Sequence, residues 1–249
     1  MELRQAHIII TGAGSGFGKA MALYFSSKGA SVFALDINGT SLSKLKKEDK
    51  TVHTYTCDVS NNGDVEEVVD TLFQNHSGIN VLINNAGIMK NAPLVNVLNR
   101  PDGRHSMALW DEVIQVNQNG VFYMARSFIN NMIKKRNKGV VINMSSIAAT
   151  GNAGQTAYSA SKAAVEAMTK VWAKELGVFG IRSVAIAPGF MNTMGTHEAL
   201  EKTMLDKWVS KTPLNRTGAI EEVILAAQFA IENDFYNGEV LGLNGGLVL

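Results

Sequence analysis

Short apolar runs alternate with longer segments of helical periodicity along this 249-residue chain. The runs are rich in Val, Ile and Leu and nearly continuous in apolar character, which is typical of parallel strands covered on both faces. Strict alternation of strand and helix predicts an α/β domain with a doubly wound parallel sheet of about seven strands flanked by helices. The expected strands are 6–11, 31–36, 51–57, 79–84, 139–145, 181–187 and 239–243, and the expected helices are 16–29, 39–47, 62–76, 107–136 (broken near Gly120), 155–179 and 219–232.

Two segments do not fit this alternation. Residues 88–106 carry Pro and Gly and resemble a loop, whereas residues 190–212 follow Pro188-Gly189 and resemble a helical flap before the last helix and strand. Ligands of open α/β sheets bind beyond the carboxyl ends of the strands. Because both segments follow strands, we expect both to border a ligand site at that edge of the sheet.

The charge, the apolar runs and the cysteine and histidine content limit the partners, the compartment and the metal sites that we expect. A net charge of +1 gives no global field toward nucleic acid or an anionic membrane, and no apolar run approaches the roughly 20 residues of a membrane span. The single cysteine, Cys57, excludes an intrachain disulfide and suits a reducing compartment. We expect a cytoplasmic protein, although an organellar protein trimmed of its targeting segment would have the same sequence. We expect no metal site, because no ligand spacing relates Cys57 to the histidines His7, His53, His76, His105 and His197.

A glycine-rich turn follows the first strand. Thr11-Gly12-Ala13-Gly14-Ser15-Gly16-Phe17-Gly18 places glycines where a tight turn lets the backbone approach a pyrophosphate, and the following helix offers free N–H groups to phosphate. The alternative is a bare strand-to-helix turn. Its position between a strand and a helix, at the start of a β-α-β unit, favours a dinucleotide site that includes Gly12, Ser15, Gly16, Phe17 and Gly18.

The second strand ends in Asp36, 18 residues beyond Gly18, close to the ~20 expected of the acidic residue that binds the adenosine ribose. A carboxylate there accepts hydrogen bonds from the ribose 2′-hydroxyl and repels a 2′-phosphate. Residue 15 is Ser and Ile37 follows Asp36, so nothing basic is placed to hold the extra phosphate of NADP. A helix-capping role for Asp36 is the alternative, but together with the glycine turn the pattern favours NAD.

Two further strand ends border the same expected site. Asp58 after the third strand could approach an adenine amino group, with Cys57 and Val59 beside the ring, or it could cap the next helix. For Cys57 a buried, purely structural role is favoured. The fourth strand ends in Asn84-Asn85-Ala86-Gly87, a sharp turn of small residues that would let a cofactor pass close to Asn85, Ala86 and Gly87.

Tyr158 and Lys162 lie four residues apart in a segment of helical period, so their side chains share one face. A free tyrosine has a pKa near 10, and a neighbouring ammonium group favours the phenolate. Tyr158 could therefore exchange a proton with an alcohol or ketone oxygen while hydride moves at the same carbon. Such a pair also occurs by chance in many helices.

Ser145 ends the fifth strand at the same sheet edge, where its hydroxyl could polarise a substrate carbonyl or steady an alkoxide. The alternative is a strand-end hydroxyl that hydrogen-bonds the loop backbone, which is common for serine.

At this point the sequence resembles the short-chain dehydrogenase/reductase family over essentially the whole chain, which implies a single Rossmann-type domain over residues 1–249. The resemblance implies a catalytic tetrad of Asn117, Ser145, Tyr158 and Lys162, in which the lysine also binds the nicotinamide ribose and the asparagine holds a water of a proton relay. It also implies that Thr193 meets the nicotinamide carboxamide. The matching signatures are Thr11-Gly12, Gly16, Gly18, Asn84-Asn85-Ala86-Gly87, Asn117, Ser145 with twelve residues before Tyr158, Lys162, and Pro188-Gly189 with Thr193.

A narrower resemblance, carried by residues 230–240, the approach to Tyr158 and the 88–106 segment, is to type 2 3-hydroxyacyl-CoA dehydrogenases. It implies an NAD-dependent homotetramer with interfaces on the 107–136 and 155–179 helices, and it places Gln155 beside the substrate with Ser145 and Tyr158. Met191 and Met194 could line an apolar substrate pocket.

Three functions remain open at this stage. The first is oxidation of a 3-hydroxyacyl-CoA or similar substrate. The second is reduction of a 3-oxoacyl carrier protein, a polyol-derived ketone or a secondary-metabolite ketone. The third is a catalytically silent NAD-sensing scaffold, which the intact tetrad disfavours.

Overall fold

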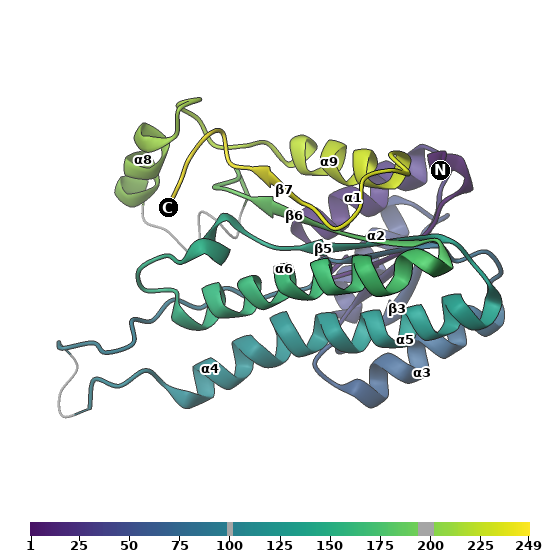
Figure 1. The fold of residues 1–249 in the computed structure, drawn as a ribbon, viewed down its shortest axis with the longest axis horizontal. Helices are drawn as coiled ribbons and strands as arrows, with labels where there is room; N and C mark the ends of the chain where they lie inside the picture. The colour runs from purple at the N-terminus through teal and green to yellow at the C-terminus, as the bar shows by residue number, and fades with distance from the viewer. Residues whose placement is uncertain (99–101, 194–201) are drawn as a thin grey trace.

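A seven-stranded sheet, parallel throughout, forms the centre of the computed structural model, which describes residues 1–98, 102–193 and 202–249 (Figure 1). The strand order β3-β2-β1-β4-β5-β6-β7 reverses direction between β1 and β4. This arrangement confirms the expected doubly wound sheet. The strands are β1 (His7–Thr11), β2 (Ser31–Asp36), β3 (His53–Thr56), β4 (Val81–Asn84), β5 (Gly139–Met144), β6 (Ile181–Pro188) and β7 (Val240–Leu243).

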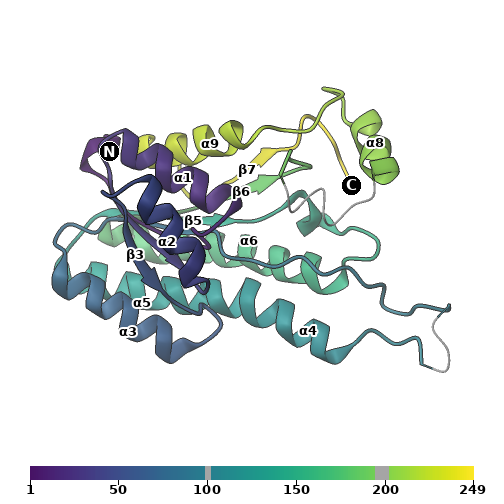
Figure 2. The same ribbon diagram turned by 180° about the vertical axis from the view of Figure 1, so that it is seen from behind.

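Helices cover both faces of the sheet (Figures 1 and 2). Three of them, α1 (Gly16–Ser27), α2 (Gly39–Glu48) and α9 (Ile220–Glu232), lie on one face. The other face carries α3 (Asn62–Asn75), α5 (Gly120–Lys135) and α6 (Thr156–Leu176), with α4 (Met107–Ile114) leading into α5. Short 3-10 turns at Leu3–Gln5, Ile147–Thr150 and Gly177–Phe179 and the helix α8 (Lys202–Lys211) complete the described elements.

The two faces hold separate apolar cores because side chains alternate along each strand. On β1, Ile8 and Ile10 pack toward α1 and α9, whereas Ile9 packs toward α3 and α5. All three are fully buried, and burying such a side chain contributes about 1.5–3 kcal/mol. The sheet is therefore held rigidly from both sides, and its strand ends form a fixed frame for a site.

The helix expected over 107–136 is interrupted before Gly120. Residues Gln115–Asn119 form a π-turn between α4 and α5, and Asn117 lies buried inside it. A π-turn adds one residue to a helical turn and is frequent at functional sites. Here it directs the Asn117 side chain toward the end of β4.

The two segments that depart from the alternation lie at the same end of the molecule. In Figure 1 the segment after β4 projects beyond the body, and α8 lies above it, away from the N-terminus. The projecting segment is partly a hairpin, because Val95 pairs with Arg104 and the His105 N–H donates to Leu94 O at 2.9 Å. Within the part of the chain that the structure describes, no helix combines the length and apolar character that a bilayer span requires.

Candidate active site

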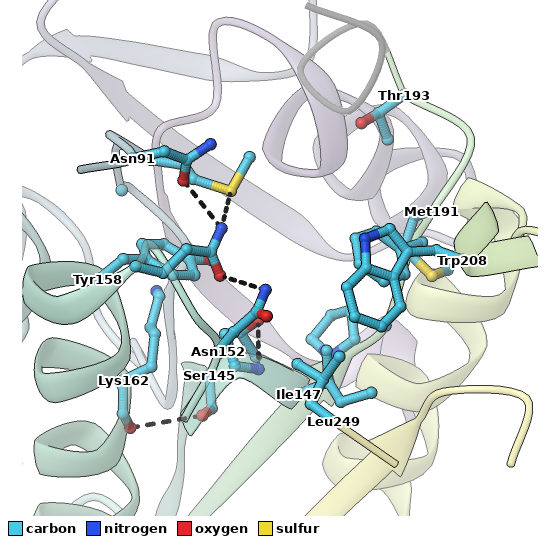
Figure 3. Close-up of a pocket in the computed structure, with 18 of the residues that line it drawn as sticks. Asn91, Ser145, Ile147, Asn152, Tyr158, Lys162, Met191, Thr193, Trp208 and Leu249 are labelled. Carbon is cyan, nitrogen blue, oxygen red and sulfur yellow. Dashed lines mark hydrogen bonds between the residues drawn. The ribbon is translucent and has the colours of Figure 1, made fainter. Parts of the chain in front are cut away.

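A cleft of about 1020 Å³ lies beyond the carboxyl ends of β4, β5 and β6. As expected, both irregular segments border it, the first through Met89 and Asn91 and the second through residues of α8. Figure 3 shows polar side chains on one wall, among them Asn91, Tyr158 and Lys162, facing apolar side chains on the other. The apolar wall comprises Ile147, Phe190, Met191, Trp208 and Leu249.

The glycine turn has the geometry of a phosphate cradle. Gly12 and Gly16 have positive φ angles of 65° and 51°, which favour glycine. A Cβ on Gly18 would lie 2.2 Å from Gly12 O, so the turn packs directly on the first turn of α1. A Cβ on Gly16 would meet nothing within 4 Å, and the helix N-terminus therefore faces open space. These features fit the pyrophosphate of a dinucleotide.

Asp36 lies at the end of β2, beside this turn. Its Oδ2 accepts the Gly14 N–H at 2.8 Å, and its Oδ1 accepts the Asn38 N–H at 2.9 Å. The side chain of Asn38, rather than that of Asp36, caps α2 by accepting from Ser41 N. Ser15 and Ile37 are exposed on either side of the carboxylate.

At the end of β3 the Asp58 side chain is hydrogen-bonded, and the side chains of Cys57 and Val59 are buried. Asp58 Oδ1 accepts from the Ser60 N–H and hydroxyl, at 2.9 and 2.6 Å, so the carboxylate organises the turn before α3. Cys57 and Val59 are 1% and 8% exposed and pack in the core under α3 and α5. Their place beside an adenine ring stays a prediction. Burial also raises the pKa of the Cys57 thiol to about 12.

The turn after β4 is tied to the glycine turn. Asn85 Nδ2 donates to Thr11 O at 2.9 Å, and Thr11 Oγ1 accepts the Asn85 and Ala86 N–H groups at 3.0 Å. Gly87 leaves room for the catalytic side chains, since a Cβ there would lie 3.2 Å from Asn117 Oδ1. This turn thus joins the expected cofactor site to the floor of the cleft.

Tyr158 and Lys162 both line the cleft from the first turns of α6. Lys162 Nζ donates to Met144 O at 2.7 Å and lies 5.7 Å from the centroid of the Tyr158 ring. Burial lowers the pKa of Lys162 to about 8. Burial also raises the pKa of Tyr158 above its ordinary value, against a smaller lowering by a hydrogen bond from Ser146. The net shift of the Tyr158 pKa is therefore upward, opposite to the lowering expected from Lys162.

Ser145 lines the cleft together with Tyr158, and its hydroxyl hydrogen-bonds α6. Ser145 Oγ donates to Glu166 Oε1 on α6 at 2.8 Å, and Figure 3 also shows its weaker 3.5 Å contact with Lys162 O. Ser146, the next residue, also lines the cleft, and its side chain acts to lower the pKa of Tyr158 against the effect of burial. The sequence reasoning passed over Ser146, although the Ser145-Ser146 pair was a visible signal that the choice of serine was open.

Asn117 is held between the strand ends and α6. Its Oδ1 accepts the Ile88 N–H at 2.8 Å, and its Nδ2 donates to Ile88 O at 2.8 Å. The same amide group lies 3.4 Å from Ser161 Oγ, next to Lys162 in sequence. The π-turn thus places Asn117, Lys162 and Tyr158 in one region, as the resemblance implied.

The segment after β6 closes the opposite side of the cleft. Gly189 packs on the last strand, since a Cβ there would lie 2.9 Å from Asn244 Cα, and its N–H donates to Leu243 O at 2.8 Å. Pro188, Gly189 and Thr193 all line the cleft, with Thr193 away from Tyr158 in Figure 3. Met191 lines it as expected, whereas Met194 lies outside the described residues.

Gln155 lies at the entrance, immediately before α6. Its Nε2 donates to Asn91 Oδ1 at 2.9 Å, and its Oε1 accepts from Asn152 Nδ2 at 3.0 Å. The three amides fix the base of the projecting hairpin against the loop that precedes α6. Sequence reasoning did not single out Asn91, Asn152, or the cleft-lining face of α8 with Lys207, Trp208 and Lys211. Among the described residues, no group of three or more His, Cys, Asp or Glu side chains is placed to hold a metal ion.

The family model of the short chain dehydrogenases matches residues 6–203. The chain belongs to the short-chain dehydrogenase family. It is therefore an oxidoreductase that interconverts a secondary alcohol and a ketone with NAD or NADP.

Relatives of this short-chain dehydrogenase span its full length. The 3-oxoacyl-[acyl-carrier-protein] reductase of Thermotoga maritima is 41% identical over 256 residues, with 100% of both chains covered. The sorbitol-6-phosphate 2-dehydrogenase of Klebsiella pneumoniae is 35% identical over 240 residues, covering 90% of this chain and 88% of that protein. These names match the second function left open by the sequence better than the first, 3-hydroxyacyl-CoA oxidation.

A solved structure supports the same family. The gluconate 5-dehydrogenase of Burkholderia cenocepacia J2315, in complex with NADP and tartrate, superposes with a TM-score of 0.89 at 28% identity. The match covers 97% of this chain and 94% of that one. The dinucleotide in that complex is NADP, so the fold by itself does not separate NAD from NADP use.

Proposed function

We propose that this short-chain dehydrogenase interconverts 3-oxoacyl and 3-hydroxyacyl thioesters, such as those of an acyl carrier protein, and that it prefers NAD(H). The observation that carries the proposal is the convergence of Tyr158, Ser146 and Lys162 on a cleft with one apolar wall. The name of the Thermotoga maritima relative supports the thioester class. The apolar wall would accept an acyl chain, and the polar wall would meet the oxygen at the reacting carbon.

In the proposed chemistry Tyr158 carries the proton. Its buried hydroxyl stays protonated at neutral pH, because burial raises its pKa, and it can donate to an oxygen that becomes an alkoxide. Ser146 supplies a second hydroxyl at the same oxygen. A bound nicotinamide would supply or accept the hydride at the adjacent carbon.

Lys162 and Asn117 support that proton transfer. Lys162 is fixed by its bond to Met144 O, and its ammonium group near the Tyr158 ring favours transient negative charge on the phenol oxygen. Asn117 holds the Ile88 backbone and so the turn that forms the floor of the cleft. We assign Asn117 to the proton relay that the family resemblance implies.

A substrate series tests the thioester class. We expect NADH oxidation with acetoacetyl thioesters of acyl carrier protein or CoA at a kcat/KM well above that with ketoses or gluconate-derived ketones. Tyr158→Phe should lower kcat by about 10²–10⁴ while NADH binding, followed by fluorescence titration, persists. Turnover confined to sugars would overturn the thioester assignment. Absence of turnover on every ketone, with NADH still bound, would favour the silent scaffold.

Asp36 supports the preference for NAD. Its carboxylate lies where a 2′-phosphate would have to approach, and Ser15 and Ile37 beside it offer no positive charge. We expect Asp36→Ala to lower the ratio of kcat/KM for NADH over NADPH by about tenfold or more, since a nearby like charge costs several kcal/mol. Lys135→Gln, on the exposed end of α5, is the control. An unchanged cofactor ratio would exclude the ribose role.

A further inference from the structure

One face of α8 lines the cleft and carries both apolar and cationic side chains. Thr203, Met204, Lys207, Trp208 and Lys211 all contribute to the lining, and their spacing places them on one side of the helix. Lys207 and Lys211 are four residues apart, so their side chains leave the helix about 5–6 Å from one another. The two ammonium groups therefore flank Trp208 along the rim of the cleft.

Lys207 and Lys211 carry positive charge at the rim of the cleft. The described residues that line the cleft include three lysines and neither aspartate nor glutamate. The ion pairs found among the described residues involve neither Lys207 nor Lys211. The third lysine, Lys162, is buried at the floor and donates to Met144 O. The rim therefore presents two lysines that no described aspartate or glutamate side chain pairs with.

Aromatic contacts hold this face of α8 in place. Trp208 stacks on Phe190 with ring centroids 5.3 Å apart and an interplanar angle of 25°. Lys211 Nζ lies 5.1 Å from the centroid of the Trp208 ring, within range of a cation–π interaction. Because Phe190 follows the end of β6 directly, α8 is docked against the sheet edge. The lysine thus has a preferred position before any ligand binds.

We propose that Lys207 and Lys211 form an anion-binding subsite that holds a phosphate on the non-reacting end of the substrate. Lysine binds phosphate as a point charge, and two such charges suit a dianion. The reacting carbon then lies at Tyr158 and Ser146, and the arm that joins the thioester to the phosphate passes along the part of the wall on α8, beside Trp208 (Figure 3). The assignment of this phosphate to a phosphopantetheine thioester rests on the proposed function, whereas a sugar phosphate would share the same chemistry.

A matched pair of thioesters isolates the phosphate. Acetoacetyl-4′-phosphopantetheine carries the charge, and acetoacetyl-pantetheine is the neutral thioester that lacks only the phosphate. We expect Lys207→Gln and Lys211→Gln each to lower kcat/KM for the phosphorylated substrate by about fivefold, and the double variant by more, with the neutral substrate unchanged. Lys135→Gln is the control. The preference of the wild-type enzyme for the phosphorylated thioester should shrink as ionic strength rises, because salt screens the attraction.

Two further experiments distinguish a sugar phosphate from a phosphopantetheine, and a wrong subsite from a wrong thioester function. Fructose 6-phosphate against fructose tests a sugar phosphate in the same variants. Calorimetric binding of 4′-phosphopantetheine against pantetheine needs no turnover, so it tests the subsite even if the thioester function is wrong. Equal effects on charged and neutral ligands, or no effect on either, would overturn the subsite. A raised KM for NADH with unchanged substrate parameters would overturn it too, because the lysines would then serve the dinucleotide.

Discussion

Two adjacent serines follow the last strand residue of β5, and their hydroxyls serve different neighbours. Neighbouring residues of an extended segment point to opposite sides, so the two hydroxyls meet different neighbours although both residues line the cleft. Ser145 donates to Glu166, and Ser146 lies beside Tyr158. A spacing of twelve intervening residues before the tyrosine selects Ser145, but the length of the loop between strand and helix decides which hydroxyl reaches the tyrosine. That loop geometry is not visible in a spacing.

The serine pair gives a prediction with an internal control. We expect Ser146→Ala to lower kcat by about 10²–10³, the usual effect of removing one hydrogen-bond donor to a developing alkoxide. Ser145→Ala should leave kcat within a few fold, because its hydroxyl is engaged with Glu166 outside the cleft. Steady-state rates of NADH oxidation with a 3-oxoacyl thioester distinguish them. The reverse order of the two effects would restore the Ser145 assignment.

The depressed pKa of Lys162 gives a pH dependence. Burial brings this pKa down to about 8, so the ammonium form is lost as pH rises through about 8. The Tyr158 pKa moves the other way, so the tyrosine remains a proton donor over that range. We expect kcat/KM for ketone reduction to be level near pH 7 and to fall above about pH 8. Lys162→Arg keeps its charge at high pH, and its residual activity should lack this fall. A flat wild-type profile to pH 10 would contradict the prediction.

The sequence predicted the positions of the helices and strands better than it predicted which of them contribute to the site. The strands and most helices lie within about two residues of the expected ranges, because apolar runs and helical periodicity report burial directly. The π-turn at Gln115–Asn119 was expected only as a break near Gly120, since its cause is the docking of Asn117 on Ile88. Similarly, α8 was expected as a flap, but its cleft-lining face depends on the stacking of Trp208 on Phe190. Both features are tertiary contacts that no local pattern encodes.

The hydrogen bonds between β6 and the C-terminal end of α9 give a prediction about stability. Arg182 on β6 is buried, and its guanidinium donates to Ala230 O, Ile231 O and Tyr236 O at 2.7, 3.0 and 3.1 Å. We expect Arg182→Met to lower the free energy of unfolding by about 3 kcal/mol, because buried carbonyls lose charged donors. Arg216→Met is the matched control, since that arginine pairs with Glu222 at the surface, and it should change the urea midpoint little. Equal midpoints for the two variants would contradict the capping role.

Several apolar side chains are exposed on the helices that cover one face of the sheet. Phe122 on α5 is 44% exposed and Val171 on α6 is 49% exposed, and Val178 and Phe179 follow α6 with 85% and 48%. Large apolar side chains exposed together on one face can mark a protein–protein interface. We propose that this face, formed by the 107–136 and 155–179 helices, is an interface of a homotetramer. Closed symmetric assembly would bury the same patch on every chain.

Assembly is measured directly by light scattering coupled to size-exclusion chromatography. The wild-type protein should give the mass of four chains of 26.8 kDa. Phe122→Glu combined with Val171→Glu should give dimers or monomers, because a buried unpaired carboxylate opposes association. Ser43→Glu, exposed on α2 at the opposite face of the sheet, adds a carboxylate away from the proposed interface and should remain tetrameric. Circular dichroism shows whether the double variant keeps its fold, since the substituted positions lie outside the two cores. A wild-type monomer, or a tetramer unaffected by both glutamates, would place the interface elsewhere or exclude it.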